Sequence, residues 1–293
     1  MKNRYYRVGG LTFCIHPVNV DGVVVGMPDS YQPFRLQDQT DDLLFTLTLD
    51  QVFHFSEMGT KLGRFNEDNN PQEVYRKADG GYQFLLYSYD KVLSAEMETD
   101  QAFRYITLRL QGSPQQQLFG LNNAVMISYA FSSARCGTLL MHSSVTMLRS
   151  WGYMFLGKSG TGKSTHSALR LKYFQGTELL NDDNPVLRVN DKGRVTVYGS
   201  PWSGKTPCYK NKHARVGALV MLEQKPYNRI ERQDVPHALS SLLISCSLMM
   251  WDGPTYHAII NTISRILQAV PVYHLENLPN RDAAELCRSV IER

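Results

Sequence analysis

The stretch that decides the expected fold is Gly157-Lys158-Ser159-Gly160-Thr161-Gly162-Lys163-Ser164-Thr165. It fits the phosphate-binding pattern G-x-x-x-x-G-K-[ST], in which glycines let the backbone curl so that successive N–H groups face phosphate oxygens. The pattern assigns Lys163 to the β- and γ-phosphates of a nucleotide and the Ser164 hydroxyl to Mg²⁺. We therefore expect a P-loop that binds ATP and Mg²⁺. Its expected contacts are Gly157, Ser159, Gly160, Thr161, Gly162, Lys163, Ser164 and Thr165.

The residues on either side of this stretch supply the context that the pattern requires. Tyr153 to Leu156 reads as a short buried strand, and Ser164 to Phe174 reads as a helix. The positive N-terminal end of that helix would add to the attraction for phosphate. Helices mixed with strands around a phosphate loop predict a layered α/β domain.

Composition and charge narrow the class of protein. The chain has 293 residues, of which 43% are hydrophobic and 20% charged, as is ordinary for a soluble globular protein. The net charge of +4 comes without a basic block, which gives no reason to expect a nucleic-acid partner. Five scattered cysteines favour a reducing compartment over a disulfide framework. No apolar run reaches the length of about 18 residues that a membrane span needs. We expect a cytoplasmic protein.

The chain divides into two regions by pattern. Residues 1–112 are β-rich, and residues 118–293 carry the mixed pattern of the α/β domain, with the polar stretch 112–117 as the expected linker. In the second region, 138–148 reads as one strand, 236–250 as one helix and 281–291 as a closing helix. The β-rich region shows short alternating stretches separated by turn formers, namely Leu11 to Ile15, Val23 to Val25, Leu43 to Leu49, Phe84 to Tyr89 and Tyr105 to Leu110.

An acidic pair follows the next predicted strand after the motif. Asp182 and Asp183 come directly after Glu178 to Leu180. If that strand lies beside the P-loop strand, both strands end at the same edge of the sheet, where open α/β sheets bind ligands. One carboxylate would bind Mg²⁺ and the other would accept the proton of an attacking hydroxyl. We assign Asp182 to the metal and Asp183 to the base, although Asp-Asp-Asn-Pro is also good turn chemistry.

Two further candidates come from a histidine and a lysine. His142 lies in the predicted strand 138–148 and would orient the carboxylate base, or be a structural histidine. Lys205 lies in the Gly/Pro-rich segment 199–207 and would neutralise charge on the transferred phosphoryl group. Trp202 of the same segment would cover a bound acceptor or nucleotide. The alternative is an exposed hairpin end with an ordinary lysine.

These residues together resemble the catalytic domain of HPr kinase/phosphorylase, which shares its nucleotide-binding core with phosphoenolpyruvate carboxykinase. The resemblance covers roughly residues 118–293. It implies a P-loop-containing α/β domain, preceded here by the β-rich region. It also implies that the chain could form a homo-oligomer. The shared features are His142, the G-x-S-G-x-G-K-S loop at 157–164, the Asp182-Asp183 pair, and, for a divergent branch of the family, the segments 200–205 and 270–275.

The sequence also departs from that family. Thr165 stands where HPr kinases carry an acidic residue tied to metal binding, and the C-terminal part carries no HPr-docking signature. The β-rich region does not resemble the usual regulatory domain. The resemblance therefore implies the nucleotide site more strongly than it implies HPr as the substrate.

Three functions fit these observations. The first is an ATP-dependent kinase that transfers the γ-phosphoryl group to a hydroxyl, a serine by preference, of a peptide, protein or small molecule. Its catalytic residues would be Asp183, Asp182, His142 and Lys205. The second is a nucleotide-binding regulatory protein without its own acceptor. The third is a carboxykinase-like enzyme, which would need substrate-binding arginines that the sequence does not identify.

Overall fold

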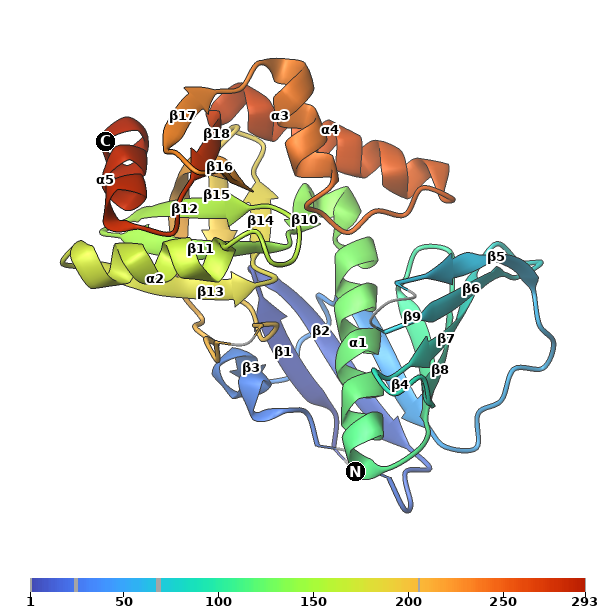
Figure 1. Cartoon of the computed structure of the whole chain (residues 1–293). Coiled ribbons are helices and arrows are strands. Elements are labelled where there is room, and N and C mark those ends of the chain that lie inside the picture. Colours follow the sequence, from blue (N-terminus) through green and yellow to red (C-terminus); the bar gives the residue numbers. More distant parts are fainter. Residues whose placement is uncertain (1, 24–25, 67–69, 205, 293) are drawn as a thin grey trace. The chain divides into compact units, whose positions relative to one another are not determined.

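The structure is a computed structural model, and it describes residues 2–23, 26–66, 70–204 and 206–292. The chain forms two compact units, Met1–Ser133 and Ala134–Arg293, each built around its own mixed sheet (Figure 1). The protein is therefore a mixed α/β protein with two large mixed sheets.

The first unit carries a nine-stranded sheet in the order β3-β1-β2-β4-β9-β8-β7-β6-β5. Its neighbouring strands are antiparallel except for β2 with β4 and β4 with β9, which are parallel. The strands are β1 (Arg4–Val8), β2 (Leu11–Val18), β3 (Arg35–Leu36), β4 (Phe45–Asp50), β5 (Thr60–Phe65), β6 (Gln72–Arg76), β7 (Tyr82–Tyr87), β8 (Leu93–Thr99) and β9 (Tyr105–Leu110), with the 3₁₀ helix η1 (Asp29–Phe34) before β3.

A long helix, α1 (Pro114–Ser132), closes the first unit. It begins in the stretch expected to be a linker, because Ser113 and Gln116 form a reciprocal capping box and Pro114 occupies the first turn. The helix then packs on the sheet: the Tyr129 hydroxyl donates to the carbonyl of Val8 at 2.9 Å. The division between the compact units thus falls after α1, whereas the sequence pattern grouped residues 118–133 with the second region.

The second unit is a sheet with helices on both faces. Its strand order is β10-β14-β15-β16-β12-β11-β13, and β18 pairs with both β16 and β17. The strands are β10 (Thr138–Leu140), β11 (Ser143–Leu148), β12 (Trp151–Leu156), β13 (Thr177–Asp183), β14 (Val186–Val189), β15 (Val195–Tyr198), β16 (His213–Gln224), β17 (Arg229–Arg232) and β18 (Val272–Asn277), and the helices are η2 (Ala134–Cys136), α2 (Lys163–Tyr173), α3 (Val235–Leu243), α4 (Gly253–Ala269) and α5 (Arg281–Ile291).

Alternating side chains of the central strands divide the core of this unit into two layers. Met154 and Leu156 of β12 join a cluster with Leu242 of α3 and Ile263 of α4. The intervening Phe155 joins a second cluster, which includes Cys287 and Ile291 of α5. This period of two, with apolar residues on both faces, is what a strand covered by helices on both sides requires (Figure 1).

Two predicted elements of this unit are wrong in extent, for the same physical reason. The strand expected over 138–148 breaks at His142, where the backbone N–H donates to the carbonyl of Ser245 at 2.6 Å. The helix expected over 236–250 ends at Leu243, because the following residues bond to the broken strand. The backbone of Met141 forms an isolated antiparallel β-bridge with that of Cys246, and the Ser247 N–H donates to the carbonyl of Leu140 at 3.2 Å. These tertiary backbone hydrogen bonds override the local apolar pattern.

Across the part of the chain that the structure describes, no helix has the length and apolar character needed to cross a membrane.

Candidate functional site

The glycine-rich segment, residues 157–162, joins the end of β12 to the start of α2. Glycine is required at two of its turns. Gly162 precedes the helix at φ +96°, and a Cβ atom at Gly157, which has φ +145°, would lie 2.5 Å from Thr161 Oγ1. Side-chain-bearing residues rarely adopt these backbone conformations. The segment can therefore hold the tight curl that the sequence motif predicts.

The first turn of α2 faces solvent at this point. Among the described residues no side chain caps the helix at Gly162. The first N–H groups of a helix have no partner within the helix, and the helix dipole adds partial positive charge there. Ser164 and Thr165 are exposed in the same turn, and Lys158 of the preceding segment is also exposed. The turn therefore presents donors and partial positive charge to an anion.

Lys163 lies inside the curl. Its side chain is only 9% exposed, and Nζ donates to the carbonyl oxygens of Gly157 at 2.8 Å and Lys158 at 3.1 Å. Burial lowers the pKa of Lys163, whereas the negative charges of Asp183 and Asp182 act in the opposite direction. The ammonium group is thus held by the loop itself and lies within electrostatic reach of the acidic pair.

Strand register brings the acidic pair to the same edge of the sheet as the glycine-rich segment. Ser143 at the start of β11 pairs with Leu156 at the end of β12 and with Asp183 at the end of β13. Because β11 is antiparallel to both neighbours, β12 and β13 run in the same direction and end together. The two strands are not direct neighbours, since β11 lies between them, but they still end at the same edge of the sheet.

Asp182 is on the α2 face of this edge. It pairs in register with Ser144, whose Oγ lies 2.7 Å from Ser167 Oγ of α2. The Asp182 side chain is 6% exposed, and its buried Oδ1 has no hydrogen-bond partner among the described residues. A buried carboxylate oxygen without a partner is costly, and a cation or a donor from a ligand would satisfy it.

Asp183 has polar contacts at both carboxylate oxygens. Oδ1 lies 3.3 Å from His142 Nε2, and Oδ2 accepts a hydrogen bond from Asn184 Nδ2 at 2.6 Å. His142 comes from the break between β10 and β11, where its backbone N–H is bonded to Ser245. The histidine expected from sequence to orient the base therefore lies next to that carboxylate.

The segment after β15 packs directly on the acidic pair. The backbone of Ser203 forms an isolated antiparallel β-bridge with that of Asp183, and the Gly204 N–H donates to the carbonyl of Asp182 at 3.3 Å. Lys205 itself lies outside the described residues, so its predicted role stays a prediction. Trp202 is only 3% exposed and its carbonyl accepts from Asn184 N at 3.2 Å. The tryptophan is therefore buried within the protein, and its expected role in covering a ligand stays a prediction.

Three residues of this edge were missed by sequence reasoning. Gln224, at the end of β16, donates from Nε2 to the carbonyl of Gly160 at 3.0 Å. Asn181 holds the loop after β15 through Ser200 Oγ at 3.1 Å, and Asn184 contacts Asp183. The signal that could have identified them is their shared position, since each lies within two residues of the carboxyl end of a strand.

Behind the site, α2 carries two buried basic side chains. His166 is 1% exposed, and the centroid of its ring lies 4.7 Å from the centroid of the Phe155 ring. Arg170 is fully buried, with Nε donating to Thr146 Oγ1 at 3.1 Å and the guanidinium paired with Glu292 near the end of α5. Burial, and after it the charge of Arg170, lowers the pKa of His166 to about 3.

His166 is expected to make folding sensitive to acid. Its folded pKa of about 3 is below the unfolded value near 6.5, so the unfolded state binds the extra proton and stability falls as pH drops from about 6.5 towards 3. At pH 5 the loss is about 2 kcal/mol. Urea unfolding at pH 7.5 and pH 5 measures it. His166→Leu should reduce the difference between the two pH values, whereas His257→Leu, at an exposed position of α4, should not. An unchanged difference in His166→Leu would contradict the prediction.

The candidate metal donors are few. Within residues 2–23, 26–66, 70–204 and 206–292, no three His, Cys, Asp or Glu side chains cluster to hold a metal ion. Ser164 at the start of α2 and Asp182 at the end of β13 offer a hydroxyl and a carboxylate at one edge of the sheet. This donor set fits Mg²⁺, which binds through one or two carboxylates and keeps waters and substrate phosphates as its other ligands.

Comparisons with known proteins show only weak similarity, and that similarity is to solved structures. No protein-family model matches the chain, and no curated protein sequence matches it. The structure is similar to the Hpr(Ser) kinase/phosphatase from Coxiella burnetii, with a TM-score of 0.31 and 14% sequence identity, over 52% of this chain and 87% of that chain. Similarity at this level carries no functional argument, so the chemistry of the site has to be inferred from its own residues.

The site combines three capacities at one edge of the second sheet. The glycine-rich segment and the first turn of α2 offer N–H donors and Lys163 to an anion. Asp182 offers an unsatisfied carboxylate oxygen, and Asp183 offers a carboxylate that contacts His142. Anion binding beside two carboxylates is the arrangement that phosphoryl transfer uses.

Proposed function

We propose that this protein is an ATP-dependent kinase that transfers the γ-phosphoryl group to a hydroxyl, by preference a serine, of a peptide, protein or small molecule. The observation that carries the proposal is the shared edge of the sheet. The glycine-rich segment 157–162 follows β12 and the acidic pair Asp182-Asp183 ends β13, and these two strands run in the same direction with β11 between them. In this proposal the second unit belongs to a P-loop domain of the HPr kinase type, which the sequence resemblance implies for roughly residues 118–293.

The phosphate chain would lie against the first turn of α2. Backbone N–H groups of residues 157–165 would face its oxygens, and Lys163 would exchange the carbonyls of Gly157 and Lys158 for the β- and γ-phosphates. Gln224 supports this arrangement, because its hydrogen bond to the Gly160 carbonyl fixes the orientation of that peptide.

The magnesium ion would be held by Ser164 and Asp182. When bound, Mg²⁺ supplies positive charge that offsets the negative charge of the phosphate oxygens. The buried Oδ1 of Asp182, which has no hydrogen-bond partner among the described residues, supports this assignment. Asp182 would therefore act mainly on the affinity for the metal–nucleotide complex.

Asp183 would take the proton of the acceptor hydroxyl. As that O–H bond breaks, the acceptor oxygen forms a bond to the γ-phosphorus, and the bond from this phosphorus to the bridging oxygen breaks to release ADP. His142 Nε2 at 3.3 Å and Asn184 Nδ2 at 2.6 Å would hold the carboxylate in place, one on each oxygen. His142 would therefore be a positioning residue.

Labelled ATP tests the proposal directly. The full chain is incubated with γ-labelled ATP and Mg²⁺ in an extract of the source cells, and the phosphorylated species is identified by mass spectrometry. A species that gains acid-stable phosphate with wild type, and not with Asp183→Asn, is the expected result. ADP formation that no hydroxyl-bearing acceptor stimulates would instead support the regulatory alternative, and no nucleotide binding at all would exclude both.

A further inference from the structure

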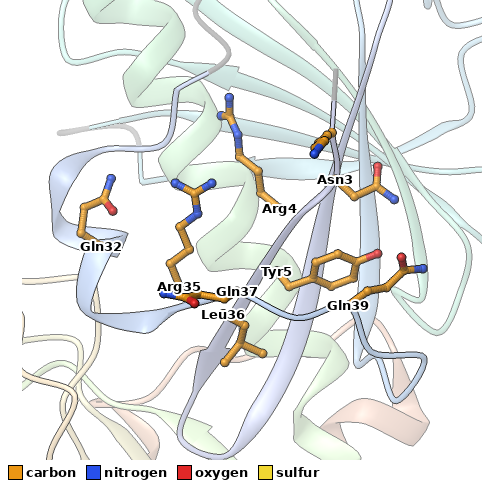
Figure 2. Close-up of a pocket in the computed structure, with 9 residues that line it drawn as sticks. Asn3, Arg4, Tyr5, Gln32, Arg35, Leu36, Gln37 and Gln39 are labelled. Carbon is orange, nitrogen blue, oxygen red and sulfur yellow. The ribbon is translucent and has the colours of Figure 1, made fainter.

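A cavity of about 820 Å³ lies at the edge of the first sheet, beside β1 and β3, and Figure 2 shows nine residues that line it. Three of these nine are the cations Lys2, Arg4 and Arg35, and four carry side-chain amides. None of the nine is acidic. The volume is in the range of about 300–1,000 Å³ typical of small-molecule sites, and the lining has the charge that suits an anion.

The side chains of Arg4 and Arg35 lie on the same face of the sheet as Tyr6. Arg35 pairs in register with Tyr6, and Arg4 is two residues from Tyr6 on β1, so both side chains share its face of the sheet. Figure 2 shows the guanidinium groups of Arg4 and Arg35 pointing in the same direction, with Gln32 on their side of β1. Burial raises the pKa of Tyr6, and the charges of both arginines oppose that rise. Both positive charges thus lie within electrostatic reach of the Tyr6 hydroxyl.

The backbone that presents Gln32 and Arg35 is anchored in the core. Tyr31 and Phe34 of η1 are buried, and the Tyr31 hydroxyl donates to Asn122 Oδ1 of α1 at 2.9 Å. The Tyr6 ring packs edge-on against Tyr31, with 5.7 Å between ring centroids. The Arg35 N–H donates to the Gln32 carbonyl at the end of η1. These contacts fix the backbone positions of Gln32 and Arg35, whose side chains are exposed and open to a ligand.

We propose that this cavity binds a small organic anion carrying at least two negative charges on oxygen, as in a phosphate ester or a di- or tricarboxylate. Arg4 and Arg35 would hold the oxyanion, since guanidinium groups form paired hydrogen bonds to carboxylate and phosphate. Gln32 would add a neutral donor, and Lys2 a further charge. The inference is independent of the kinase proposal, because all of these residues belong to the first unit.

Calorimetric titration of the full chain tests this site with citrate, glycerol 2-phosphate and, as a monoanion control, acetate. Saturable binding of citrate or the phosphate ester is expected, and the tighter of the two identifies the oxyanion class. Arg35→Gln should weaken that binding about 10- to 100-fold, as expected for losing a charged hydrogen-bond donor. Arg104→Gln removes the same charge from an exposed turn of the same unit and should change the affinity less than about 2-fold.

A second titration shows whether the anion binds in this cavity or at the glycine-rich segment, which could also bind phosphate. Binding should persist unchanged in Lys163→Ala. Loss of binding in Lys163→Ala would overturn the proposal, because the anion would then lie in the second unit. Equal weakening by Arg35→Gln and Arg104→Gln would also overturn it, as would the absence of saturable binding by either probe. Melting temperatures of the variants identify any that fail to fold, and Arg4→Gln then provides the independent variant.

Discussion

Lys163→Ala is expected to lower the affinity for MgATP by about 10²-fold or more, because two or more charged hydrogen bonds to the β- and γ-phosphates are lost. The side chain is buried in the curl of the glycine-rich segment, and its ammonium group donates to the carbonyl oxygens of Gly157 and Lys158. Among the residues that the structure describes, no carboxylate forms an ion pair with Nζ, so a phosphate would displace carbonyl contacts there. Calorimetric titration with MgATP measures the effect.

Two controls separate loss of charge from loss of structure. Lys163→Met keeps much of the side-chain volume and should lose affinity as Lys163→Ala does. Lys158→Ala removes the same charge from an exposed position in the same segment and should keep most of the affinity. MgATP affinity in Lys163→Met equal to that of wild type would show that residues 157–165 do not bind the phosphate chain.

Asp183→Asn is expected to lower turnover by about 10²-fold or more while MgATP binding is retained, since it removes a general base and nearly preserves shape. The asparagine can still contact His142 and Asn184, which lie at the two oxygens of the native carboxylate. Steady-state kinetics with an identified acceptor, beside MgATP titration of the same variant, separate the two effects.

Two other aspartates serve as comparisons for this variant. Asp182→Asn should act mainly on the affinity for the metal–nucleotide complex, because Asp182 Oδ1 is the buried oxygen that lacks a protein hydrogen bond among the described residues. Asp191→Asn, in the exposed turn between β14 and β15, should leave both quantities unchanged. Normal turnover in Asp183→Asn would place the base elsewhere.

Elements whose limits are set by residues close by in the sequence were well predicted. The strand Tyr105–Leu110 and the helix Arg281–Ile291 have the expected limits. In the helix the limit is set locally, since Asn280 caps it by accepting from Ala283 N at 2.9 Å. The limits of the 236–250 segment depend instead on backbone bonds to residues more than a hundred positions away, such as that of Ser245 with His142. Local periodicity contains no information about such bonds.

The same distinction holds for the candidate site. The curl at 157–162 is a local motif, so the sequence alone predicts it. The approach of His142 to Asp183 depends on β11 lying between β12 and β13, which requires the strand order. The burial of Trp202 and the contact of Gln224 with Gly160 likewise depend on how separate segments pack. An aromatic residue in a Gly/Pro-rich loop gives no sign of which way it points.

The pairing of Arg170 with Glu292 has a consequence for how the chain acquires its structure during synthesis. The two residues are 122 positions apart, and Arg170 is fully buried. At translation rates of about 5 to 20 residues per second, the arginine leaves the ribosome roughly 6 to 24 s before its carboxylate. A buried guanidinium without its counterion is strongly destabilising. We therefore expect the helix that follows the glycine-rich segment to pack stably against the sheet only after Glu292, the residue just beyond α5, has been made.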